Sequence, residues 1–184
     1  MRELSNLTGT HLYTINELSQ ILTVHTLPAT GQPKLIARMS ILDSTDSPHA
    51  ATMGPAEIIL LPSLSPSAPL LLLCSNRDSP SPEGDTIAAF SVDPSDGAKV
   101  ERTEQGWVRG CGAHLRAMAE DDSGRFVAVA GRNGGGLSVL ERVGKDGVRL
   151  QEVARLEGGR EGGGSALGPR VGSFLYTCQV RENV

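Results

Sequence analysis

Short runs of alternating apolar and polar residues, separated by turn residues, make up most of the chain. Runs of this kind predict β-strands, and no segment of useful length shows a helical period. Residues 70–75 (LLLLCS) form a continuous apolar run instead, which is typical of a strand buried on both faces. The pattern predicts an all-β chain with strands at 11–16, 20–26, 34–41, 56–61, 70–75, 85–92, 99–103, 114–119, 125–130, 136–143, 148–156 and 173–180.

The predicted strands repeat as a unit. Each unit contains an apolar strand that ends in a polar pair, a short loop, an alternating strand, a turn rich in Asp and Gly, and an amphipathic strand. The apolar strand and its polar pair recur as LYTI before Asn16-Glu17, LLCS before Asn76-Arg77 and AVA before Gly131-Arg132. A four-stranded antiparallel unit that repeats in this way predicts a β-propeller.

The repeats place blades at about 1–43, 56–105 and 113–156, with three strands in the first of them. Residues 157–184 form a Gly-rich tail with one possible closing strand. A blade takes about 40–45 residues and about 4–8 blades close a ring, so the chain amounts to about half of a seven-bladed propeller. Because an open arc leaves strand edges and blade faces unpaired, we expect either a piece of a longer protein or self-association through the open blade edges.

Composition narrows the class of protein. Hydrophobic residues make up 39% of the chain, and 22 Gly and 11 Pro favour a turn-rich packed domain over a helical bundle. The net charge of −4 and the lack of a Lys/Arg block argue against nucleic-acid binding. No apolar run approaches the roughly 20 residues of a membrane helix, so we expect no membrane partner. With no secretory signal and three scattered cysteines (Cys74, Cys111, Cys178), we expect reduced thiols in a cytoplasmic protein.

Four motifs follow one another along the chain: L-Y-x-x-N-E-x-x-x-x-x-x-V from Leu12, Ala56-Glu57-Ile58, S-N-R-D…G-D-T-I-A-x-F from Ser75 and Gly112-Ala113-His114-Leu115-Arg116. Together they resemble the lactonase seven-bladed β-propeller family, which includes propeller-type 6-phosphogluconolactonases and 3-carboxy-cis,cis-muconate lactonizing enzymes. The resemblance extends to about Leu156 and corresponds to the C-terminal half of the family. No Trp-Asp or Gly-His marker of scaffold propellers is present.

Charged residues at the ends of predicted strands are the candidate site. Glu17 ends an apolar strand, where we expect a partly desolvated carboxylate that acts as general acid or base. Arg77 holds the equivalent position one unit later, and its guanidinium suits a substrate carboxylate or phosphate. The resemblance implies roles in substrate binding and proton transfer for Glu17, Arg77 and His114, which we predict to be catalytic, and it places Glu57 where the family commonly has an acidic residue. We predict that Glu57, Arg77 and Arg116 bind substrate, and for Arg116 a surface role is the alternative. The alternative for each is a solvated or ion-paired charge at a strand end.

Two functions from different classes follow. The first is a lactonase or muconate-type cycloisomerase that opens or closes a lactone ring on a small anionic lactone or dicarboxylate, without metal or cofactor. The four histidines have no metal-ligand spacing with the cysteines, so we predict no zinc site. The second is a non-catalytic truncated propeller that acts as a binding or structural module.

Overall fold

The computed structural model describes residues 2–5, 9–132 and 136–156. Within them no helix is long and apolar enough to cross a membrane. One short 3-10 helix, η1 (Ser47–His49), lies in the connector after the first four strands. The strands are β1 (Arg2–Ser5), β2 (His11–Asn16), β3 (Ile21–Thr26), β4 (Lys34–Ser40), β5 (Gly54–Leu61), β6 (Leu70–Arg77), β7 (Thr86–Val92), β8 (Val100–Arg109), β9 (Leu115–Glu120), β10 (Phe126–Gly131), β11 (Leu137–Val143) and β12 (Arg149–Leu156).

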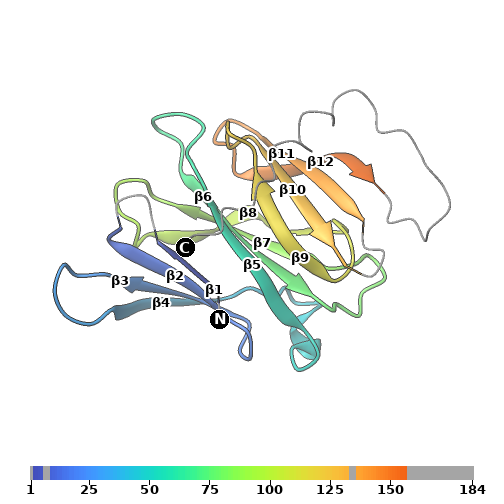
Figure 1. Ribbon diagram of the computed structural model, residues 1–184, viewed down its shortest axis with the longest axis horizontal. Helices are drawn as coiled ribbons and strands as arrows, with labels where there is room; N and C mark the ends of the chain where they lie inside the picture. The colour runs from blue at the N-terminus through green and yellow to red at the C-terminus, as the bar shows by residue number, and fades with distance from the viewer. Residues whose placement is uncertain (1, 6–8, 133–135, 157–184) are drawn as a thin grey trace, which may run out of the picture.

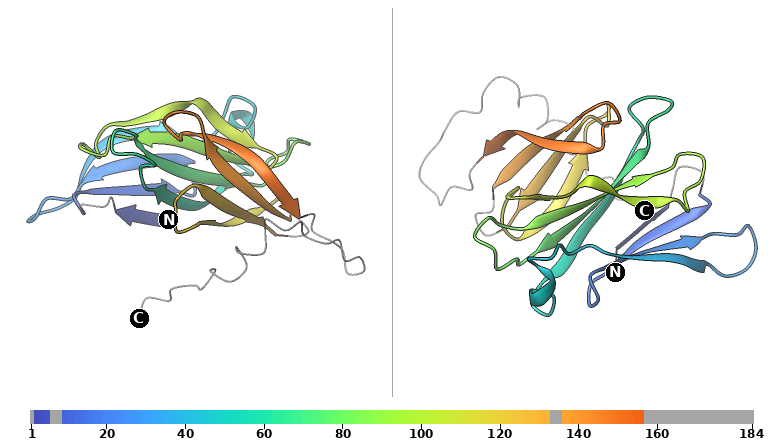
Figure 2. Two further views of the ribbon diagram at one scale, coloured as in Figure 1. Left: turned by 90° about the horizontal axis from the view of Figure 1, so that it is seen from above. Right: turned by 180° about the vertical axis from the view of Figure 1, so that it is seen from behind.

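The described strands form three antiparallel four-stranded sheets, each following chain order: β1 to β4, β5 to β8 and β9 to β12. Figure 1 shows the sheets side by side, with the second sheet between the first and the third, and Figure 2 shows the same arrangement from above and from behind. The first strand of the middle sheet, β5, contacts both β1 and β9, so β1, β5 and β9 are the inner strands. This is a partial propeller, as the pattern predicted.

The structure differs most from the predicted strands in two places. The first sheet has four strands rather than three, because Arg2–Ser5 pairs antiparallel with β2. The outer strand of the second sheet, β8, extends to Arg109, six residues beyond the predicted end. A register shift between Ala88 and Phe90 of β7 accommodates the extra residues of β8. The predicted strand at 173–180 lies outside the described residues.

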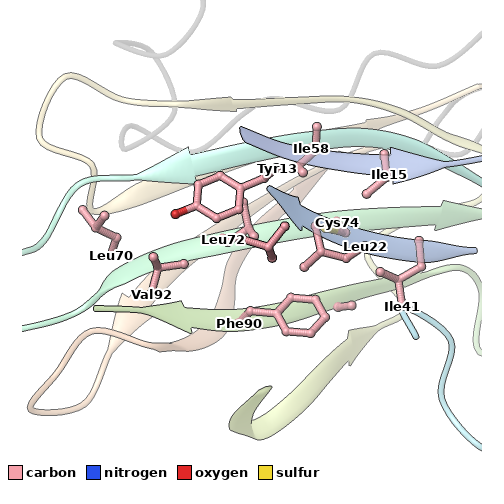
Figure 3. Close-up of a cluster of buried hydrophobic side chains, with 12 residues drawn as sticks. Tyr13, Ile15, Leu22, Ile41, Ile58, Leu70, Leu72, Cys74, Phe90 and Val92 are labelled. Carbon is pink, nitrogen blue, oxygen red and sulfur yellow. The ribbon is translucent and has the colours of Figure 1, made fainter. Parts of the chain in front are cut away.

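The core consists of two apolar layers, one on each side of the middle sheet. Leu70, Leu72 and Cys74 of β6 face the first sheet, whereas Leu71 and Leu73 face the third. All residues from 70 to 75 are buried, which confirms the strand buried on both faces. Figure 3 shows the layer between the first two sheets, which includes Tyr13, Ile15, Leu22, Leu72, Phe90 and Val92.

The asparagines of the repeated polar pair hold one end of the first sheet and one end of the second by side-chain hydrogen bonds. Asn16 Nδ2 donates to the Ile21 carbonyl at 3.2 Å, within its own sheet. Asn76 Nδ2 donates to the Ile41 carbonyl at 2.8 Å and to Thr86 Oγ1 at 3.3 Å. The two amides thus fix the ends of β2 and β6. The residue after each of them, Glu17 or Arg77, is charged and lies at the same end of its sheet.

Candidate functional site

Four ionisable residues form a continuous chain where β2 and β6 end and β9 begins. Arg77 Nη2 donates to Glu17 Oε1 at 2.6 Å, and Arg77 Nε lies 3.8 Å from Asp78 Oδ2. Asp78 Oδ1 in turn lies 2.6 Å from His114 Nδ1. The three predicted catalytic residues therefore come together across all three sheets, and Asp78 connects two of them.

Glu17 is more exposed than we expected. Its carboxylate-bearing side chain is 52% exposed and paired with Arg77, so the expected partial desolvation was wrong. Arg77 is only 18% exposed and His114 23%. Arg77 is also less free than expected, because one of its five N–H donors already binds Glu17. The remaining donors are the ones available for an anionic ligand.

Strained backbone accompanies this chain of ionisable residues. Among the described residues, the non-glycine residues with positive φ are Gln20 (49°), Asp78 (65°) and His114 (52°). Such left-handed conformations cost on the order of 1–3 kcal/mol each and persist where surrounding contacts hold them. Gln20 Nε2 donates to the carbonyls of Glu17 at 3.1 Å and Met53 at 3.0 Å, which fixes the turn that carries Glu17.

An open depression of about 260 Å³ lies beside the ion pair. Leu18 is 97% exposed on its rim, directly after Glu17. The other residues that line the depression are Glu17, Gln20, Ala50, Ala51, Thr52, Met53, Gly54, Arg77 and Asp78.

The two further predicted binding residues lie on inner strands. Glu57 is half-buried in β5, at a register shift between Pro55 and Ile58, and its backbone N–H donates to Ser75 Oγ at 3.0 Å. Arg116 lies on β9 and is exposed. Both residues thus lie on inner strands, and their roles in substrate binding stay predictions.

The contact between Asp78 and His114 determines what the imidazole does. A carboxylate only accepts hydrogen bonds, so neutral His114 in this contact carries its proton on Nδ1 and has a free lone pair on Nε2. The site thus offers a base at His114 Nε2, a cation at Arg77 and two carboxylates. In the described part of the chain, no group of three or more His, Cys, Asp or Glu residues is arranged to hold a metal ion.

Sequence analysis did not single out Asp78. The residue stands directly after Arg77 in the S-N-R-D run, and a carboxylate adjacent to a candidate arginine was the available signal. Its contact with His114, 36 residues later, depends on how the second and third sheets pack. The packing of the two sheets cannot be inferred from the spacing of residues in the sequence.

The three sheets define the class of the protein as a β-propeller. The family described as "Lactonase, 7-bladed beta-propeller" matches residues 4–161. The chain therefore belongs to the lactonase seven-bladed β-propeller family, as its motifs indicated. No curated protein matches the chain significantly.

Solved structures agree on the fold. A candidate 6-phosphogluconolactonase from Bacteroides fragilis is 21% identical with a TM-score of 0.66, and the match covers 85% of this chain and 38% of that one. The periplasmic gluconolactonase PpgL of Pseudomonas aeruginosa is 20% identical with a TM-score of 0.65, covering 86% and 39%. A Lactobacillus plantarum protein is 18% identical with a TM-score of 0.65, covering 84% and 40%. The chain thus spans about two fifths of these structures.

Proposed function

We propose that the complete protein opens a small lactone ring by hydrolysis, with His114 as general base. The observation that carries the proposal is the hydrogen-bonded pair of Asp78 and His114 beside Arg77, all at one end of a lactonase-family propeller. A carboxylate on Nδ1 orients the imidazole and stabilises the imidazolium that forms when Nε2 takes a proton. His114 suits the role of base better than Glu17, whose carboxylate is held by Arg77.

The chemical step uses groups of the chain and one water molecule. His114 Nε2 takes a proton from water as the water oxygen attacks the lactone carbonyl carbon. The bond between that carbon and the ring oxygen then breaks, and the imidazolium returns the proton to the departing ring oxygen. Arg77 has N–H donors left to bind an anionic group of the substrate or the oxyanion, and Glu17 Oε1 fixes its guanidinium.

The names of the structural relatives support a lactone substrate, since one is a gluconolactonase and another a candidate 6-phosphogluconolactonase. The same groups also suit a different reaction, ring closure by addition to a double bond, whose reverse is a β-elimination and not a hydrolysis. In a muconate-type cyclisation a substrate carboxylate, oriented by Arg77, attacks a double bond and a protonated side chain delivers a proton to the adjacent carbon. In both reactions Glu57 and Arg116 are proposed to contact the substrate from the inner strands, and the substrate is a small anionic lactone or dicarboxylate.

The test is a comparison of two variants of the hydrogen-bonded pair in the complete protein. Losing a general base costs about 10²- to 10⁴-fold in rate, so H114Q should lower kcat/KM for an anionic lactone by at least a hundredfold. D78N should lower it less, because the imidazole is retained. The matched control is H11Q, since His11 begins β2 at the end opposite to Glu17. Turnover by H114Q at the rate of the unmodified protein would refute the proposal.

A second candidate is the non-catalytic module, in which the three blades associate with another copy. It is favoured by a groove of about 480 Å³ on the outer face of the first sheet and by exposed apolar residues on outer strands. Leu35 and Ile36 on β4 are 37% and 39% exposed, and Val153 on β12 is 47% exposed. Light scattering on the 184-residue chain should then give a mass that rises with concentration. A monomer that turns over lactone would contradict this function.

A further inference from the structure

One buried carboxylate, that of Asp85, binds the backbone beside both Asp78 and His114. Asp85 is 2% exposed and lies just before β7. Its Oδ1 accepts the backbone N–H of Ser79 at 2.9 Å, and its Oδ2 accepts the backbone N–H of Leu115 at 3.0 Å. Ser79 directly follows Asp78, and Leu115 directly follows His114. A single side chain therefore fixes the backbone next to both members of the pair.

We propose that Asp85 is a positioning residue that sets the hydrogen bond between Asp78 and His114. Its effect on turnover rests on the proposed function, whereas its effect on the geometry of the pair does not. Both Asp78 and His114 have positive φ, a conformation that other contacts must maintain. The carbonyl of His114 is held as well, because it accepts the N–H of Arg132 at 3.0 Å.

A second group of partly buried contacts holds the loop after Asp78. Ser79 Oγ donates to Asp46 Oδ1 at 2.7 Å, and Arg109 Nη1 donates to Ser79 Oγ at 3.0 Å. Arg109 Nη2 also donates to Asp46 Oδ2 at 2.9 Å and to Asp43 Oδ2 at 2.6 Å. Asp46 is fully buried. Ser79 is thus held through its side chain by this group and through its backbone by Asp85.

The chemistry of a carboxylate explains why an acid occupies this place. Burial raises the pKa of Asp85, and the N–H donors of Ser79 and Leu115 act in the opposite direction. Two oxygens accept two N–H groups at once, each on a different segment. An asparagine side chain has one oxygen and one NH₂ group, so in the D85N variant the NH₂ would face an N–H donor. D85N therefore keeps the shape of the side chain but loses one of the two bonds.

The experiment compares D85N with R142M in the complete protein, labelled with ¹⁵N-histidine. Arg142 is a matched control: it is 3% exposed and donates to the carbonyls of Pro62, Gly124 and Gly147 near the opposite end of the third sheet. The unmodified protein should show His114, assigned with H114Q, as the Nδ1–H tautomer when neutral. D85N should show a mixture of tautomers. R142M should lower the thermal midpoint and leave the His114 ring signals unchanged.

The outcomes separate the two proposals. If the lactone assay is positive, D85N should lower kcat by about 10- to 100-fold, as a small misplacement of catalytic groups does. If no lactone is turned over, the proposed function fails, and the tautomer measurement still tests Asp85. A folded D85N whose His114 ring signals match the unmodified protein overturns the positioning role, as does the same change in R142M.

If the D85N variant does not fold, hydrogen exchange in the unmodified protein tests the proposal instead. Ser79 lies outside the strands, and Leu115 is the first residue of β9. Bound by a buried carboxylate, the amides of both residues should exchange with solvent as slowly as amides in β6. Rapid exchange at both positions would overturn the proposal.

Discussion

Replacing Tyr13 by Phe removes one hydroxyl from the layer between the first two sheets. Tyr13 is fully buried, and its hydroxyl donates to the Gly97 carbonyl at 2.8 Å, a contact between two blades. The hydrogen bond contributes about 1 kcal/mol, and leaving a buried carbonyl unpaired raises the cost to at most about 3 kcal/mol. At roughly 2–4 °C per kcal/mol for a domain of this size, Y13F should lower the midpoint of thermal unfolding by about 2–12 °C.

Because the hydroxyl of Tyr13 titrates, the difference in free energy of unfolding between the unmodified protein and Y13F should depend on pH. Burial, followed by the charge of Asp96, raises the pKa of Tyr13 from 10.0 to about 12. Because the unfolded chain releases this proton near pH 10 and the folded chain near pH 12, the stabilising contribution is full below pH 10 and is lost between pH 10 and 12. A shift of about two units corresponds to about 3 kcal/mol.

The assay is urea unfolding of both proteins at about pH 8 and about pH 11.5, followed by the fluorescence of Trp107. Phe does not titrate, so the free energy of unfolding of the unmodified protein should fall by about 2 kcal/mol more than that of Y13F between the two pH values. All other titrating groups are common to both proteins and cancel in the comparison. Equal stability at the lower pH, or a difference that stays constant up to the higher pH, would refute the packing of Tyr13 between the blades.

Three further predictions concern the core and the inner strands. L72A should lower the free energy of unfolding by about 2–5 kcal/mol in urea titrations, because Leu72 is fully buried; a loss below about 1 kcal/mol would contradict its place in the core. Burial raises the pKa of Cys111 to about 12 and also raises that of Cys74, so mass spectrometry should find neither alkylated by iodoacetamide at about pH 8 until the protein unfolds. R116Q should change stability by at most about 0.5 kcal/mol and raise KM for an anionic lactone; an unchanged KM would remove Arg116 from the binding site.

Much of the fold could be predicted from the sequence because period-two alternation and turn residues mark strands directly. The run at 70–75 predicted the strand buried on both faces, which both apolar layers confirm. The strand Arg2–Ser5 was missed because four residues are too short to show a period, and its pairing with β2 is a tertiary contact. The extension of β8 was missed because it depends on a register shift that only the partner strand reveals.

The candidate site, like the fold, could be predicted from the sequence only in part. Repetition placed Glu17 and Arg77 at equivalent strand ends, so their proximity followed from the blade repeat. Their direct pairing, across 60 residues and two sheets, did not follow from it. Asp78 and Asp85 act through loops with left-handed backbone and through the packing of neighbouring sheets. Such contacts leave no period in the sequence, and the exposure of Glu17 depends likewise on tertiary structure.

The rate of lactone opening by the complete protein tests the central claim most directly. Acid release at constant pH should be followed for 6-phosphogluconolactone and for an uncharged lactone of the same ring size, with the spontaneous rate subtracted. The account predicts turnover above the spontaneous rate, faster for the anionic lactone and lost in H114Q. Acid release at the spontaneous rate for both lactones would contradict it.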